Sequence, residues 1–106
     1  MYYDKDGLPI SVQSWMTLFE TVSYCVIKQE TANDGSFVST VWTGMVSGYC
    51  NSKPLIFETM AFKEKDSTEI LEGRKYPNLK AALIGHEEVV KLRNEAPRHF
   101  LRKLEP

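Results

Sequence analysis

The residues of this chain whose types could do chemistry are Glu58, His86 and Glu87. A histidine beside a carboxylate is a common acid–base pair at neutral pH, and both groups also bind metal ions. The zinc-protease motif His-Glu-x-x-His fails here, because Val90 stands four residues after His86. A nucleophile elbow, a phosphate-binding glycine loop and a dinucleotide fingerprint are all absent from the sequence. The sequence therefore favours a protein that is not an enzyme, with no catalytic residue, metal site or cofactor.

Glu58 is the most unusual of these residues, because it interrupts the apolar run PLIFETMAF at residues 54–62. Side chains alternate along a β-strand, so Glu58 shares one side with Ile56, Met60 and Phe62. An unpaired charge on an apolar face costs several kcal/mol or is neutralised by a raised pKa. We therefore expect Glu58 to have a partner.

Two candidates for that partner lie on the apolar stripe of the last predicted helix, His86 and Arg93. A Glu58–His86 pair, joined by Glu87, could serve a small hydrolase or nuclease as acid and base. Alternatively, the pair only fixes the helix on the sheet. The two interpretations differ in whether the side chains converge around a cleft.

An α+β domain would position these residues, as an antiparallel meander of three or four strands packed with two helices. Ser11 and Asn78 are good N-caps, Asp34-Gly35 is a hairpin signal, and Pro97 is expected to end the second helix. The predicted helices cover residues 11–20 and 78–96, and the predicted strands cover residues 21–31, 36–46, 55–62 and 69–76.

Both sides of the predicted sheet carry large apolar groups, so both faces are expected to be at least partly buried. Either the two helices cover opposite faces, or the second face is a homodimer interface or a ligand platform. Aromatic residues near the ends of elements suit recognition of a partner. The expected binding residues are Trp42, Tyr49, Glu58 and His86.

The 106 residues are predicted to form one domain, with residues 97–106 a tail that docks on the body or binds a partner. The net charge of −1 provides no footprint for general nucleic-acid binding. Cys25 and Cys50 are expected to be reduced. The start of the chain has no signal peptide pattern, and no run reaches the ~20 apolar residues of a membrane span. These features predict a cytoplasmic protein without membrane contact.

Four blocks of the sequence, YDKDGLPIS, VSTVWTG, PLIFETMAF and GHEEVV, resemble a family of small proteins encoded in bacteriophages and prophages. The resemblance spans about residues 3–90, and the order and spacing of the blocks make it more specific than any single block. The stretch YPNLKAALI departs from the family, which tends to have a Ser or Thr cap followed by acidic residues. The tail after Val90 is particular to this sequence, so contacts made by it would not be shared.

The resemblance implies a phage accessory protein and supplies no reaction. Small phage proteins of this kind often act by stoichiometric binding of a host component in the host cytoplasm. They include inhibitors of CRISPR effectors, blockers of other defence proteins and sponges for signalling nucleotides. The expected partner is thus a host protein or a signalling nucleotide, with a small hydrolase or a homodimeric assembly factor as the alternatives.

Overall fold

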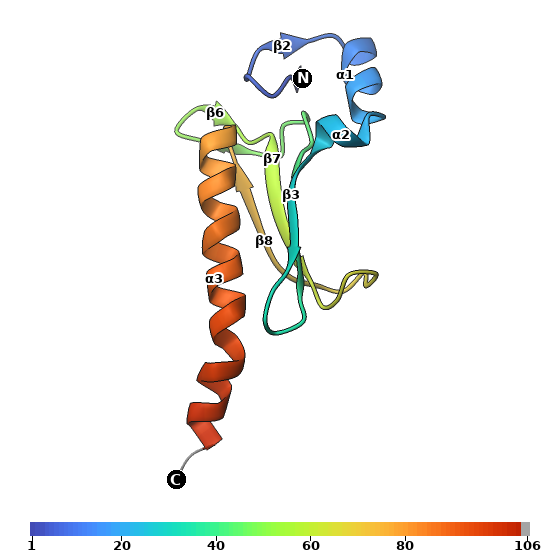
Figure 1. The fold of residues 1–106 in the computed structure, drawn as a ribbon. Helices are drawn as coiled ribbons and strands as arrows, with labels where there is room; N and C mark the ends of the chain where they lie inside the picture. The colour runs from blue at the N-terminus through green and yellow to red at the C-terminus, as the bar shows by residue number, and fades with distance from the viewer. Residues whose placement is uncertain (105–106) are drawn as a thin grey trace.

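One four-stranded antiparallel sheet, in the order β3-β4-β7-β8, forms the body of the molecule. The computed structural model of the chain describes the backbone of residues 1–104 and the side chains of residues 1–95. The long helix α3 (Leu79–Leu104) packs along one face of the sheet (Figure 1). The strands are β3 (Val26–Thr31), β4 (Phe37–Trp42), β7 (Phe57–Phe62) and β8 (Ile70–Tyr76). The predicted α+β class and the antiparallel meander are confirmed.

Short elements gather at one end of this sheet, where the N-terminus lies (Figure 1). They are two helices and two two-stranded ladders: α1 (Val12–Phe19), α2 (Val22–Cys25), β1 (Tyr2–Tyr3) with β2 (Pro9–Ile10), and β5 (Tyr49–Cys50) with β6 (Lys53–Pro54). The ladders and α2 were not predicted, because two-residue strands and a single helical turn are too short to produce a periodic pattern.

The two main helices begin where the capping residues predict. The Ser11 hydroxyl accepts a hydrogen bond from the Ser14 N–H at 3.1 Å, and the Asn78 side-chain oxygen accepts one from the Ala81 N–H at 2.8 Å. Each bond satisfies a backbone donor that the first turn of a helix leaves free. Both predicted helix starts are therefore confirmed to within a residue.

Two predicted strands are shorter than expected at their ends. The strand expected over residues 21–31 begins at Val26, because the N–H groups of Tyr24 and Cys25 bond to the Thr21 carbonyl and close a helical turn. The strand expected over residues 36–46 ends at Trp42. The chain then turns at Gly44, with φ of 69°, where a Cβ would lie 2.4 Å from the Trp42 ring. Only glycine fits such a position.

The prediction that Pro97 ends the last helix is wrong, since α3 continues through it to Leu104. A proline inside a helix removes one hydrogen bond and makes a boundary probable rather than certain. Figure 1 shows the helix running past the end of the sheet. The prediction that the tail at residues 97–106 docks on the body or on a partner lies outside the described side chains.

The buried face of the sheet is the one that α3 covers. Along β7 the side chains of Phe57, Thr59 and Ala61 are buried, whereas those of Glu58 and the other alternate residues are half-buried. In β4 the register places Val38, Thr40 and Trp42 beside these inward residues. The opposite face, called here the open face, has no helix packed along it (Figure 1). Among the described residues, no helix is long and apolar enough to cross a membrane.

Candidate functional site

His86 lies at the centre of the contact between α3 and the sheet, with no exposed surface. Its Nδ1 is 2.7 Å from the Thr40 hydroxyl, and its Nε2 is 2.9 Å from a carboxylate oxygen of Glu30. The Thr40 hydroxyl is in turn 2.5 Å from that of Thr59. Glu30, His86, Thr40 and Thr59 form a continuous chain of polar groups, called here the polar layer.

The polar layer separates the two apolar clusters of the core. One cluster surrounds Trp42 and Phe57 and includes Ala82 of α3; the other surrounds Val38 and includes Val89. His86 stands one helical turn from each of the two α3 residues, so it meets the sheet between the clusters. Because a buried polar group must be hydrogen-bonded, the layer fixes the register of α3 against the sheet.

The order carboxylate, imidazole and hydroxyl is also the order of a nucleophilic triad. A nucleophile must, however, be open to substrate, and the side chain of Thr40 has no exposed surface. Thr59 is 1% exposed. Of the four residues of the polar layer, only Glu30 reaches solvent, with a side chain that is 35% exposed. The geometry therefore supports a structural network and not a hydrolytic centre.

Tyr76 lies beside the far end of the polar layer and packs against the backbone of α3. A Cβ built on Gly85 would lie 2.2 Å from the Tyr76 hydroxyl and from its ring, so only glycine allows this contact. The hydroxyl is buried without a hydrogen bond in the described part of the chain. Burial raises the pKa of the Tyr76 hydroxyl, because the phenolate is disfavoured away from water.

Glu30, His86 and Glu87 are also the described residues that come closest to a metal site, since one ligand atom of each lies within 4.8 Å of the others. The amino group of Lys28 already fills the space between the two carboxylates. It is 2.5 Å from Glu87 and 3.7 Å from Glu30. These contacts raise the pKa of Lys28 and lower that of Glu87, chiefly through the hydrogen bond between them. A lysine ammonium thus supplies the cation that this cluster needs.

The expected partnership of Glu58 with His86 or Arg93 is wrong. Glu58 points to the open face, while His86 lies on the covered face with Glu30 and Thr40 as its partners. Arg93 pairs instead with Asp34 and Glu72, at 3.7 and 3.4 Å. The prediction failed because α3 covers the other face of the sheet from the one that Glu58 shares with Met60 and Phe62.

The two aromatic residues expected to bind a partner lie in different surroundings. Trp42 has no exposed surface; its indole N–H donates to the Tyr3 carbonyl at 3.1 Å, and its ring meets Tyr24 edge to face. It belongs to the core. Tyr49 is 67% exposed on the short strand β5, where a partner could reach it.

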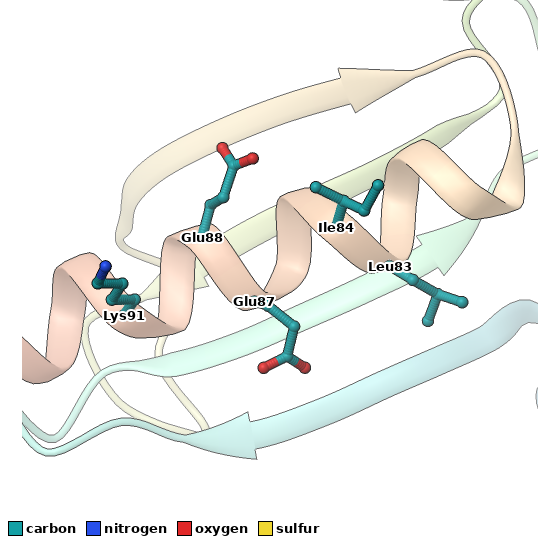
Figure 2. Close-up of a pocket in the computed structure, with 5 residues that line it drawn as sticks. All are labelled: Leu83, Ile84, Glu87, Glu88 and Lys91. Atoms are coloured by element: carbon teal, nitrogen blue, oxygen red, sulfur yellow. The ribbon is translucent and has the colours of Figure 1, made fainter.

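The solvent-facing side of α3 carries a shallow hollow, lined by Leu83, Ile84, Glu87, Glu88 and Lys91. Figure 2 shows Leu83 and Glu87 pointing to one side of the helix and Ile84 and Glu88 to the other. Leu83 and Ile84 are 42% and 52% exposed, so two large apolar groups lie at one end of the hollow, and the three charged residues follow them along the helix (Figure 2). We call this feature the α3 hollow.

Ion pairs on both sides of α3 hold the α3 hollow in place. Glu87 pairs with Lys28 of β3, and Glu88 pairs with Arg74 of β8 at 3.0 Å. The helix is thereby tied to both edge strands of the sheet.

A second exposed apolar stripe, called here the α1 stripe, lies on α1 and consists of Val12, Met16 and Phe19, of which Met16 is 51% exposed.

The sequence could have identified part of the polar layer. Thr40 lies two residues from Val38 and from Trp42, and Thr59 lies two residues from Phe57 and from Ala61, so period-2 analysis places both threonines on the side of these apolar residues. Glu30 gave no such signal, because its contact with His86 joins residues 56 apart.

Comparison with known proteins adds no assignment: no family model, curated protein sequence or solved structure matches the chain.

Proposed function

We propose that this chain is a phage-encoded accessory protein that binds a host protein stoichiometrically in the host cytoplasm, without catalysing a reaction. The observation that carries the binding role is the α3 hollow, in which Leu83 and Ile84 are exposed on a helix held rigid from both sides. The four sequence blocks support the phage origin. Evasion of a host defence system, such as inhibition of a CRISPR effector, is the role that this origin favours.

A protein partner suits the hollow better than a nucleotide does. Protein interfaces combine large apolar groups with polar and charged ones, and the hollow presents Leu83 and Ile84 next to Glu87, Glu88 and Lys91. A nucleotide brings phosphates, which need several cations or backbone N–H groups. Lys28 and Arg74 are engaged by Glu87 and Glu88, so among the described residues Lys91 is the one cation of the lining left for a phosphate. A signalling-nucleotide sponge is therefore the less favoured role.

A hydrolase or nuclease based on Glu58, His86 and Glu87 is also less favoured. Glu58 lies across the sheet from His86, and both ring nitrogens of His86 already have protein partners. Glu87 is occupied by Lys28. Catalysis would require these groups to converge on one cleft.

Site-specific photo-crosslinking in bacterial cells tests the proposal. A benzoyl-phenylalanine residue is placed at Ile84 in the α3 hollow, at Met16 on the α1 stripe or at the exposed Lys53 of β6, and adducts are identified by mass spectrometry. The expected result is one host protein crosslinked through position 84, at a stoichiometry near one, and not through position 53.

Charge placed in the hollow provides the matched functional control. Ile84→Glu should abolish capture of the crosslinked protein and any protection of phage growth, because a carboxylate in an apolar contact is left unpaired. Lys80→Glu, at an exposed position one turn away, should leave capture unchanged. Adducts at position 16 alone would move the site to α1, and the absence of a specific adduct at either position would contradict the proposed function.

A further inference from the structure

We infer that the open face of the sheet is a self-association surface, on which a second copy of this chain packs sheet against sheet about a two-fold axis. The helix α3 occupies the covered face, so the open face is the side of this sheet along which no helix of the described residues packs (Figure 1). This inference concerns a surface other than the α3 hollow and does not depend on the proposed host partner.

Apolar side chains lie around Ser39 at the centre of the open face, where the Ser39 hydroxyl accepts a hydrogen bond from the Gln29 side chain at 2.9 Å. The register places Val41, Met60 and Phe62 on it together with Phe37, and all four side chains are half-buried although no helix covers them. Gly73 stands opposite Met60 and leaves a shallow hollow between β7 and β8. A face with this composition is typical of the inner surface of a sheet packed on another sheet.

Two charges of opposite sign on this face favour a second copy over an unrelated protein. Glu58 and Lys75 are cross-strand neighbours on the open face. Within the described side chains, neither of them belongs to an ion pair. A two-fold axis between β7 and β8 would bring Glu58 of each copy to Lys75 of the other. The surface is thus complementary to itself, as an isologous interface requires.

The open face approaches the size that a small dimer interface needs. Strands of six residues are about 20 Å long, and four strands span about 19 Å across the sheet, which gives about 400 Å² of projected area per copy. Two copies would cover about 800 Å² before the roughness of the side chains is counted. A specific interface should exceed about 1,000 Å² in total, so the flat area of the face accounts for most of that minimum and the relief of the side chains has to supply the rest.

Charge reversal in sedimentation velocity experiments tests this inference. Wild-type chain should sediment at twice the monomer mass at concentrations near 50 µM. Glu58→Lys alone, or Lys75→Glu alone, places like charges opposite each other at both of the symmetry-related contacts between the copies. Either change should weaken the dimer at least ~100-fold. The double variant Glu58→Lys with Lys75→Glu restores both pairs with their signs exchanged and should restore the dimer.

Two control variants separate this surface from other effects. Met60→Glu places an unpaired carboxylate among the apolar side chains of this face and should give a monomer whose circular dichroism is native. Ile84→Glu, on the opposite side of the molecule, should leave the dimer intact and so distinguishes this interface from the α3 hollow. A monomeric wild-type chain, or a dimer that both single reversals leave unchanged, would overturn the inference.

Discussion

Replacing Thr40 by valine should test how much the polar layer contributes to stability. Valine has nearly the shape of threonine, so the change removes the hydroxyl and leaves the packing of β4 almost unaltered. The Thr40 hydroxyl bonds both to His86 and to Thr59, and all three side chains are buried. The substitution therefore leaves two buried polar groups without a partner.

The expected loss follows from the cost of those two groups. A buried polar group left without its hydrogen bond costs about 1–3 kcal/mol. Thr40→Val should then lower the free energy of unfolding by about 3 kcal/mol. Thr59→Val leaves the Thr40–His86 bond intact and should cost only about 1 kcal/mol. The double variant leaves one orphaned group, the His86 Nδ1, and should cost about 2 kcal/mol.

The measurement is urea unfolding followed by tryptophan fluorescence, because Trp42 is fully buried in the folded chain. The two single costs add to about 4 kcal/mol, so the double variant should be about 2 kcal/mol more stable than additivity predicts. Such a difference is well above the ~0.5 kcal/mol within which independent sites add.

Thr31→Val provides the matched control, since Thr31 is exposed on the edge strand β3. It should change stability by no more than ~0.5 kcal/mol. If Thr40→Val cost no more than Thr31→Val, or if the double variant were additive, Thr40 would not connect Thr59 to His86 and the polar layer would have to be abandoned.

Three further outcomes follow from the contacts of Tyr76. Tyr76→Phe should raise the free energy of unfolding in urea by about 1 kcal/mol, because the lost hydroxyl is buried without a hydrogen bond. Tyr24→Phe is the control and should lower it, since the Tyr24 hydroxyl accepts a hydrogen bond from the Lys5 N–H at 2.9 Å. A lower stability for Tyr76→Phe would contradict the first expectation. Burial raises the pKa of Tyr76 above 10.0 in the folded chain, so ionisation of this hydroxyl favours the unfolded chain. The free energy of unfolding should therefore be unaffected by this ionisation below pH 10 and should fall as the pH rises from there through the folded-state pKa. Tyr76→Phe should lack this part of the fall. Gly85→Ala should destabilise the chain, because overpacking against Tyr76 costs about 1–3 kcal/mol, which exceeds the ~1 kcal/mol by which a helix favours alanine over glycine. Adding Tyr76→Phe to Gly85→Ala should not restore the lost stability, since two ring carbons of Tyr76 also lie within 2.3 Å of the new Cβ. If the double variant regained full stability, the clash would involve the hydroxyl alone and this expectation would be wrong.

Local signals in the sequence were sufficient for the class of fold. The caps at Ser11 and Asn78 predicted the starts of both main helices, and the Asp34-Gly35 turn predicted the hairpin between β3 and β4. These signals depend on residues three or four apart, so a single chain segment contains all the information they need.

The face of the sheet that the helix covers was less predictable than the alternation along each strand. Glu58, Met60 and Phe62 were assigned to one side, and the structure places all three on one side. The helix α3 covers the other side, so Glu58 lies away from His86 and from Arg93. Ile56, which precedes β7, departs from the predicted alternation.

The sequence by itself determined that this is a small α+β domain whose apolar residues exceed what one sheet face can bury. Its residue types also marked His86 and Glu58 as polar groups needing partners. Only the tertiary structure decided the partners of His86, because Glu30 and Thr40 reach it from two different strands across separations of 56 and 46 residues, and Thr59 joins through Thr40. Contacts between distant segments depend on how the helix lies on the sheet, and no local pattern in the chain contains that information.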